Sequence, residues 1–180
     1  MARRRGETHA EGRERRGAVD DPELVLAAAL RFLEARPRSV AEVRRRLTQA
    51  GYQPALVEGA IRRLKDLGML DDAAFARSWI ESRDRARPRG ERALRQELRL
   101  KGLDGALVEE ALGERGTADT DVDELAARRV LARHAAALGR VADPRARRQR
   151  AYALLARNGF DPEICASAVR AFLAQGDALN

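Results

Sequence analysis

The sequence predicts an all-α protein made of three tandem three-helix repeats, each a helix-turn-helix-like unit. Apolar residues make up 44% of the chain and are mostly Ala and Leu, while aromatic residues make up only 4%. Ala and Leu lose little conformational freedom in a helix, and the alternating Val and Ile runs that are typical of strands are missing. One apolar pattern also returns three times. We expect the repeats to stack side by side into an elongated, curved body.

The repeated pattern is centred on Gly51, Gly102 and Gly159. A Leu lies four residues before each glycine, a Leu or Ile lies five residues after it, and an Ala lies nine residues after it. The full pattern reads L-x3-G-[YLF]-x3-[LI]-[VC]-x2-A-[ILV]. Self-similarity of this kind is typical of tandem structural repeats. The predicted repeats span residues 22–70, 71–114 and 122–180.

Local signals place three helices in the first repeat. Asp21 and Pro22 are typical of a helix start, because Asp accepts a free backbone N–H and proline has none to satisfy. Ser39, followed three residues later by a glutamate, predicts a capping box at the second helix. Gly51 ends that helix, because glycine takes the left-handed conformation without strain. The third helix is predicted over residues 54–66.

The second repeat is organised around the stretch from Leu67 to Gly102. Either Asp71 or Asp72 can cap its first helix by accepting a free N–H of the first turn. Phe75 and Trp79 lie four residues apart and therefore on one face of that helix. Trp79 is the only tryptophan in the chain. We expect this stretch to form the centre of the core and Trp79 to pack in the core, although an exposed indole there could instead stack on a base.

Two segments are predicted to lie outside the repeats. Residues 1–21 combine many charges with few apolar groups, so they cannot bury enough surface to offset the entropy of ordering. We expect a disordered tail there. Residues 115–121 are predicted to be an acidic, flexible linker between the second and third repeats.

The charge balance suggests a polyanionic partner. Lys and Arg together number 35 against 28 Asp and Glu, which gives a net charge of +7 and a pI near 10.7. Positions opposite the apolar helix faces are expected to expose arginines that form a basic stripe and bind phosphates or acidic protein surface. Scattered surface arginines paired with glutamates are the alternative interpretation. The arginines predicted to bind filament or DNA are Arg45, Arg62, Arg63, Arg92, Arg99, Arg150 and Arg157.

The sequence offers little for catalysis or metal binding. Cys165 is the only cysteine, so an intramolecular disulfide is impossible and a zinc cluster lacks ligands. His9 and His134 have no evident nucleophile beside them, and two adjacent carboxylates at Asp71 and Asp72 are too few for a metal. No phosphate-binding glycine motif is present. We therefore expect no enzyme activity, no catalytic residues, no metal and no cofactor.

The sequence also bears on location and assembly. No apolar run approaches the roughly 20 residues that span a bilayer, and the arginine-rich N-terminus lacks the apolar region of a signal peptide. A single cysteine fits a reducing compartment. We expect a cytoplasmic protein that has no membrane contact and acts as a monomer.

One run of residues in the second repeat is a specific motif. It reads G-M-L-D-D-x-x-F-A-x-x-W-I-x-x-R from Gly68 to Arg83 and continues to Gly102. Together with the repeat pattern, this run resembles the RecX family, whose members regulate the RecA recombinase. The resemblance extends from about Ala28 to Leu173. The matching residues are Gly68-Met69-Leu70-Asp71-Asp72, Phe75-Ala76, Trp79-Ile80, Arg83, Pro88-x-Gly90, Leu94, Glu97-Leu98 and Lys101-Gly102.

The resemblance implies a helical repeat protein that binds within the groove of the RecA–DNA filament. There it would inhibit strand exchange and ATP hydrolysis, and so modulate homologous recombination, DNA repair and the SOS response. The third repeat departs from the pattern, because Asp143-Pro144-Arg145-Ala146 replaces the Pro-x-Gly turn of the second repeat.

Two other functions are kept as alternatives. The three-helix units could form a sequence-tolerant DNA-binding protein that contacts the phosphate backbone of single- or double-stranded DNA. Their third helices are rich in Ala, Leu and Glu and carry few Asn or Gln, which disfavours base readout. A purely structural scaffold is the other alternative, and the net charge of +7 disfavours it.

Overall fold

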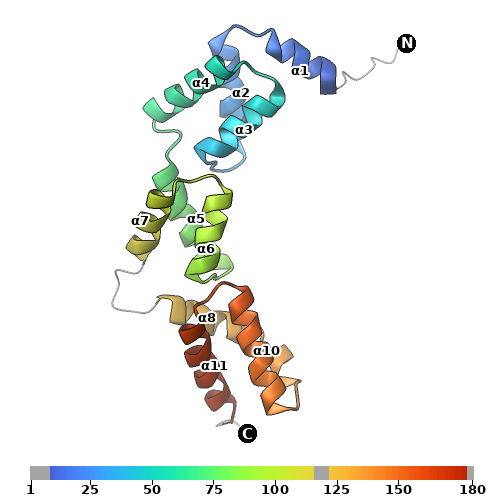
Figure 1. The fold of residues 1–180 in the computed structure, drawn as a ribbon, viewed down its shortest axis with the longest axis vertical. Helices are drawn as coiled ribbons and strands as arrows, with labels where there is room; N and C mark the ends of the chain where they lie inside the picture. The colour runs from blue at the N-terminus through green and yellow to red at the C-terminus, as the bar shows by residue number, and fades with distance from the viewer. Residues whose placement is uncertain (1–8, 116–121, 178–180) are drawn as a thin grey trace, which may run out of the picture. The chain divides into compact units, whose positions relative to one another are not determined.

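The computed structural model of the chain describes residues 9–115 and 122–177, and the regular elements in these ranges are all α-helices (Figure 1). The predicted all-α fold of tandem three-helix repeats is thereby confirmed. The first helices are α1 (His9–Gly17), α2 (Pro22–Glu34), α3 (Val40–Ala50), α4 (Pro54–Asp66), α5 (Asp72–Ala86) and α6 (Glu91–Leu100). They are followed by α7 (Gly105–Arg115), α8 (Val122–Arg133), α9 (Ala135–Gly139), α10 (Pro144–Arg157) and α11 (Pro162–Asp177).

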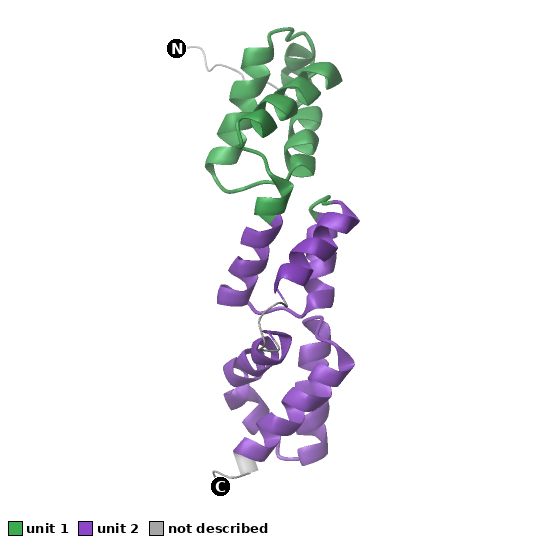
Figure 2. Ribbon diagram, turned by 90° about the vertical axis from the view of Figure 1, so that its left-hand side faces the viewer, with its two compact units in different colours: residues 1–75, 101–103 green, residues 76–100, 104–180 purple. Residues whose placement is uncertain are grey.

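The chain divides into two compact units, which Figure 2 colours separately. Unit 1 comprises residues 1–75 and 101–103, and unit 2 comprises residues 76–100 and 104–180. The turn at 101–103, between α6 and α7, therefore belongs with the first repeat. Three predicted repeats thus fall into two units, and the repeat boundaries and the elongated stack stay predictions.

The prediction of a disordered tail over residues 1–21 is wrong for residues 9–17, which form α1. This helix docks on the turn between α3 and α4. The Arg16 Nε donates a hydrogen bond to the Ala50 carbonyl at 2.6 Å, and the Gln53 side chain donates one to the Gly17 carbonyl at 3.1 Å. Composition missed α1 because its order comes from these contacts with distant residues and not from apolar content of its own. The first eight residues lie outside the described ranges.

The predicted linker, residues 115–121, also needs one correction. Arg115 is the last residue of α7, and its side chain is only 8% exposed. Its guanidinium forms ion pairs with Asp84 at 2.8 Å and Asp123 at 2.5 Å. Arg115 therefore fixes the end of α7 in unit 2, while residues 116–121 lie outside the described ranges.

The helix ends of the first repeat follow the predicted local signals. Asp21 accepts a hydrogen bond from the Glu23 N–H, and Ser39 forms the expected capping box with Glu42. Gly51 has φ 102°, in the left-handed region. Between the helices lies an apolar core. Its buried residues are Val25, Ala29, Val43, Leu47, Val57, Ala60, Ile61, Leu64 and Leu70.

In unit 1 the start of α3 is completed by residues of the second repeat. The Val40 N–H donates a hydrogen bond to the Asp72 carboxylate at 2.9 Å, and the Ser39 hydroxyl donates one to the Lys101 carbonyl at 2.6 Å. Gly102 lies against Ala41 so closely that a Cβ atom at the glycine would overlap the alanine side chain. Of the two aspartates predicted as caps of α5, Asp71 performs that role and Asp72 caps α3 instead.

The same arrangement recurs in unit 2 at the start of α6. The Gly90 N–H donates a hydrogen bond to the Asn158 carbonyl at 3.0 Å, and the Glu91 N–H donates one to the Asp123 carboxylate at 3.0 Å. Gly159 packs against Ala93 as Gly102 packs against Ala41. Neighbouring repeats are therefore connected in the same way twice. The second repeat supplies N-terminal caps for α3 of the first repeat, and the third repeat supplies them for α6 of the second.

The third repeat has its own core and its own cap. The Asp143 side chain accepts hydrogen bonds from the N–H groups of Arg145 and Ala146, so α10 begins without help from another repeat. This local cap accounts for the departure from the Pro-x-Gly turn in the sequence. The buried core residues of this repeat are Ala126, Ala127, Val130, Leu131, Leu138, Ala151, Leu155, Phe160, Cys165, Ala168 and Val169.

Trp79, which was expected to pack in the core, lies at the edge of the core. Its neighbours Ala76 and Ile80 are buried, but Trp79 is only half-buried. The indole N–H donates a hydrogen bond to Glu97 at 2.9 Å, and the Arg83 guanidinium lies 4.5 Å from the ring centroid. The indole therefore lies where its N–H has the Glu97 carboxylate as an acceptor.

We expect the close approach at Gly90 to make Gly90→Ala strongly destabilising. A Cβ atom there would overlap the backbone of Gly159 and Phe160, and overpacking of this kind costs about 1–3 kcal/mol. Gly113→Ala in α7, where a Cβ atom meets nothing, is the matched control and should keep or raise the melting temperature. Thermal unfolding followed by circular dichroism measures both, and equal melting temperatures would contradict the described junction.

We expect Glu42 to make the stability of unit 1 sensitive to acid. Burial opposes ionisation, but hydrogen bonds from Lys101 at 2.9 Å and Arg36 at 3.0 Å outweigh it and hold the pKa of Glu42 below its ordinary value of 4.5. A depressed pKa gives stability that is present above pH 4.5 and is lost as the pH falls through the folded-state pKa.

Glu42→Gln should therefore lower the free energy of unfolding at pH 7 by about 1 kcal/mol and flatten its dependence on pH below about 5. Urea unfolding across this pH range is the measurement. A variant whose acid sensitivity matches that of the unsubstituted chain would show that the Glu42 ion pairs do not contribute.

Candidate polyanion-binding surface

The arginines predicted to bind a polyanion all have exposed side chains. Their positions fit the helical geometry, because the apolar residues of the same helices point into the cores. Whether they bind DNA or protein stays a prediction. They are Arg45 on α3, Arg62 and Arg63 on α4, Arg92 and Arg99 on α6, and Arg150 and Arg157 on α10.

These arginines do not occupy equivalent positions of the repeat. Successive repeat glycines lie 51 and 57 residues apart, so the residues equivalent to Arg45 are Gln96 and Ala153. A basic stripe would thus have to be assembled from different positions in each repeat. Because the stripe would also cross from unit 1 to unit 2, its continuity stays a prediction.

Two equivalent arginines are instead neutralised within their own repeats. Arg44 pairs with Glu58 at 2.6 Å, and Arg95, at the equivalent position, pairs with Glu109 at 2.8 Å. Hydrogen bonding to Glu109 raises the pKa of Arg95 above its ordinary value, and Arg95 in turn lowers the pKa of Glu109. Arg99 approaches the same glutamate at 3.4 Å. The alternative interpretation, arginines paired with glutamates, therefore holds for this part of the surface.

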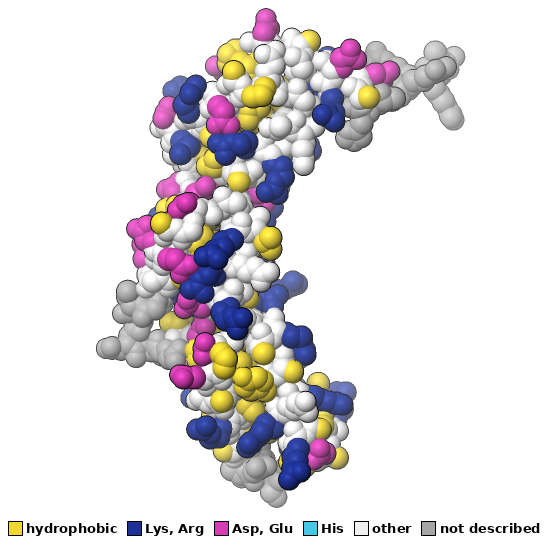
Figure 3. All heavy atoms as spheres, in the orientation of Figure 1, with side chains coloured by type: hydrophobic (Ala, Val, Ile, Leu, Met, Phe, Trp, Pro, Cys, Tyr) yellow, Lys and Arg dark blue, Asp and Glu magenta, His cyan; other side chains and the backbone are white. Residues whose placement is uncertain are grey.

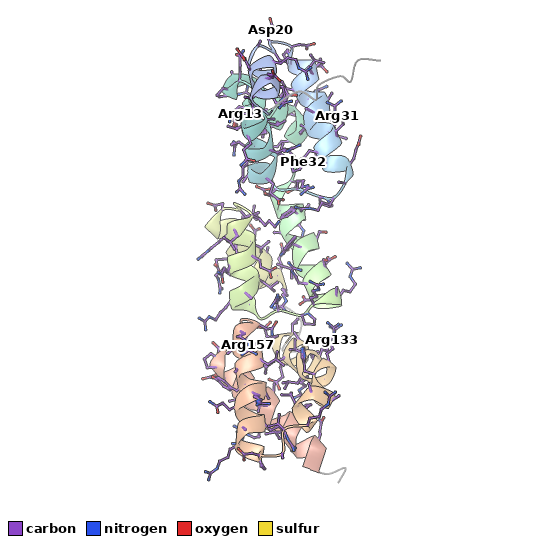
Figure 4. All side chains as sticks on the ribbon, turned by 90° about the vertical axis from the view of Figure 1, so that its right-hand side faces the viewer. Arg13, Asp20, Arg31, Phe32, Arg133 and Arg157 are labelled. Carbon is purple, nitrogen blue, oxygen red and sulfur yellow. The ribbon has the colours of Figure 1, made fainter. Side chains whose placement is uncertain are left out.

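Helix α10 has a different charge balance. It carries five arginines and no acidic residue over its 14 residues, and within the described ranges none of the five forms an ion pair. Figure 3 shows basic side chains gathered over α10 and α11 on the visible face of unit 2, and Figure 4 labels Arg157. The arginines of α10 are Arg145, Arg147, Arg148, Arg150 and Arg157.

Helix geometry selected two of these five, Arg150 and Arg157, and missed Arg145, Arg147 and Arg148. A count of charges along the stretch 144–157 would have found them, because the absence of compensating Asp or Glu is visible in the sequence. Among the described contacts, Arg147 is the only one of the five whose side chain forms a hydrogen bond, since its Nε donates to the Val141 carbonyl at 3.1 Å.

A small hollow of about 160 Å³ lies beside α10. Tyr152 and Ala166 line it, and they stand where the first two repeats place the paired arginine and glutamate. Arg148 and Arg170 line the same hollow and are both exposed. In the third repeat an apolar depression therefore stands where the first two repeats form an ion pair. The guanidinium groups of Arg148 and Arg170 flank it, and neither forms an ion pair with another described residue.

The surroundings of the remaining candidate residues, Cys165 and His134, indicate structural roles. Cys165 is fully buried, its thiol lies 3.6 Å from the Phe160 carbonyl oxygen, and burial raises the pKa of the thiol. His134 is exposed, with its Nδ1 2.9 Å from the Val130 carbonyl oxygen. Within the described ranges no group of three or more His, Cys, Asp or Glu side chains could hold a metal. No helix of that part is long and apolar enough to cross a membrane.

Comparisons with known proteins identify the relatives of this chain. Residues 26–64 match the sequence family described as "RecX, first three-helix domain", and residues 71–112 match "RecX, second three-helix domain". The regulatory protein RecX of Deinococcus radiodurans is 39% identical over 166 residues, which are 91% of this chain and 76% of that protein. The regulatory protein RecX of Streptomyces coelicolor is 33% identical over 156 residues, 87% of this chain and 81% of that protein.

A solved structure shares the fold. The crystal structure of RecX from Lactobacillus salivarius superimposes with a TM-score of 0.70 and covers 85% of this chain and 97% of that chain. Its sequence identity is 21%, so the likeness concerns the fold alone.

We expect α10 to dominate the salt dependence of DNA binding. Each phosphate contact contributes about 0.9 to the slope of log K against log salt for duplex DNA. Replacing Arg148, Arg150 and Arg157 by Gln should therefore lower the slope by about 2–3. The control with the same charge change replaces Arg44, Arg77 and Arg95, which already face glutamates. Fluorescence anisotropy at several salt concentrations gives the slope for each triple variant. If both variants lower the slope equally, the net charge alone determines DNA binding.

Proposed function

Because the chain belongs to the RecX family of regulatory proteins, we propose that it binds the RecA–DNA filament and inhibits strand exchange and ATP hydrolysis by RecA. The observation that carries this proposal is the uncompensated arginine surface of α10. Family membership supports the regulatory role, and the arginine surface supports an anionic target.

The chemistry of the surface fits a nucleoprotein. Planar guanidinium forks bind phosphates and carboxylates with two parallel hydrogen bonds, so one arginine face can engage a DNA backbone and acidic protein side chains together. Such contacts carry no base information, and binding would be tolerant of DNA sequence. Shape matching to the filament would then distinguish it from bare DNA.

The proposal assigns the protein no chemistry of its own. It would act by binding, as a monomer in the cytoplasm, with the RecA filament and DNA phosphates as partners and without a cofactor. A second candidate, a sequence-tolerant DNA-binding protein, is favoured by the same α10 charge if affinity for bare DNA equals affinity for the filament.

The test is DNA-dependent ATP hydrolysis by purified RecA, titrated with the full chain below filament stoichiometry. Bare-DNA affinity is measured at the same salt concentration. We expect strong inhibition at concentrations where bare DNA is still unbound. Replacing Arg148, Arg150 and Arg157 by Gln should weaken inhibition at least tenfold, while the Arg44, Arg77 and Arg95 control should stay within about twofold.

Tight binding to bare DNA without inhibition would contradict the proposal and leave the second candidate. If the chain neither inhibits RecA nor binds DNA, both candidate functions are contradicted.

A further inference from the structure

A hollow of about 480 Å³ opens on unit 1 between α1, α2 and α3. Its walls include the side chains of Arg16, Arg31 and Arg46 and the aromatic rings of Phe32 and Tyr52. Figure 4 labels Arg31 and Phe32, which are neighbours on α2. The volume of the hollow lies in the range typical of sites for small organic groups. No carboxylate lines the hollow.

The repeat register explains why this hollow exists. Ala28 lines it, and the equivalent residue of the second repeat, 51 positions later, is Trp79. Arg46 lines it too, and its equivalent is Glu97, which accepts the hydrogen bond from the indole of Trp79. The second repeat therefore holds its own bicyclic ring against α6. The first repeat has only a methyl group there and leaves the corresponding space against α3 open.

The charge around the open space is also reversed. Arg31 and Arg46 are exposed, and within the described ranges neither forms an ion pair or a hydrogen bond. The Arg16 Nε is fixed at the rim by its hydrogen bond to the Ala50 carbonyl at 2.6 Å. Where the second repeat presents an acceptor to a protein indole, the first repeat presents donors to an outside anion.

The arginines near Phe32 reinforce this positive field. The Arg38 guanidinium lies 4.1 Å from the Phe32 centroid, and that of Arg46 lies 5.8 Å from it. Burial, and next the charge of Arg36, lower the pKa of Arg38. The surroundings of the hollow thus carry a surplus of positive charge.

We propose that this hollow binds one nucleotide of single-stranded DNA, with the base in the space equivalent to the Trp79 indole and the phosphate against Arg31 and Arg46. A purine is a bicyclic ring like indole, and aromatic side chains bind bases of any sequence by stacking. An acidic side chain would use one guanidinium and leave the hollow unfilled. A base inside a duplex cannot leave its stack without cost, so single strands are favoured.

This inference deepens the proposed function, on which it rests for the biological source of the single strand. Its binding tests use free oligonucleotides and do not require RecA, and RecA inhibition by the same variants is measured only to distinguish a nucleotide from an acidic protein side chain as the occupant.

The first test fills the hollow with a tryptophan side chain. Ala28→Trp places in the first repeat the residue that the second repeat already has. It should weaken binding of a fluorescein-labelled single-stranded oligodeoxyadenylate about tenfold, the order expected for loss of one stacked base. Leu24→Trp is the control, because Leu24 lies on the same helix and is 54% exposed. Circular dichroism checks that both variants fold.

The second test keeps the inference falsifiable if Ala28→Trp does not fold. Replacing Arg31 and Arg46 by Gln changes only exposed side chains, and it should lower the salt slope for the single strand by about 0.7 for each phosphate lost. The matched control replaces Arg77 and Arg85, which lie on α5 opposite Glu114 and Glu81. Loss of affinity should be larger for the single strand than for a duplex of the same length.

Three results would overturn the inference. The first is equal single-strand binding by Ala28→Trp and Leu24→Trp, and the second is an equal loss of affinity for single strand and duplex when Arg31 and Arg46 are replaced. The third is loss of RecA inhibition with unchanged oligonucleotide binding. The last would indicate an acidic protein side chain as the occupant. If the unsubstituted chain does not inhibit RecA, the proposed function fails by itself and the oligonucleotide results still decide the pocket.

Discussion

The structure depends on how the first backbone N–H groups of α3 and α6 are satisfied. A helix begins with N–H groups that lack partners inside it, and each left unpaired away from water costs free energy. Here the partners come from the following repeat: Asp72 caps α3, and Asp123 caps α6. Each of the first two repeats is therefore incomplete by itself, and the sequence that completes it lies 32 residues further along the chain.

The acidic residues used in this way shape the surface that remains. In the first two repeats, carboxylates such as Glu58 and Glu109 neutralise arginines of the same repeat. In the third repeat, Asp143 caps α10 locally. Its second helix then carries arginines and no acidic residue. The positive charge of the described residues is therefore unevenly distributed, with paired arginines in the first two repeats and unpaired arginines on α10.

Equivalent positions of the repeats have acquired different tasks. Ala28 of the first repeat occupies the position equivalent to Trp79 of the second. In the same way, the hydrogen-bond donor Arg46 is equivalent to the acceptor Glu97. One backbone arrangement thus supports a filled, self-satisfied edge in one repeat and an open, basic hollow in the other. The reason is that three-helix packing constrains only the buried positions, so the residues at the edge of the core are free to diverge.

The sequence by itself determined the helices and most of their ends, because these depend on neighbours within a few residues. Gly51 and the capping box of Ser39 with Glu42 are such local signals, and the apolar spacing identified the buried faces. Only the tertiary structure decided which helix Asp72 caps, why α1 is ordered and where the Trp79 indole points. Each of those depends on a partner at least 18 residues away, and the choice among distant partners is made by packing, which local patterns do not encode.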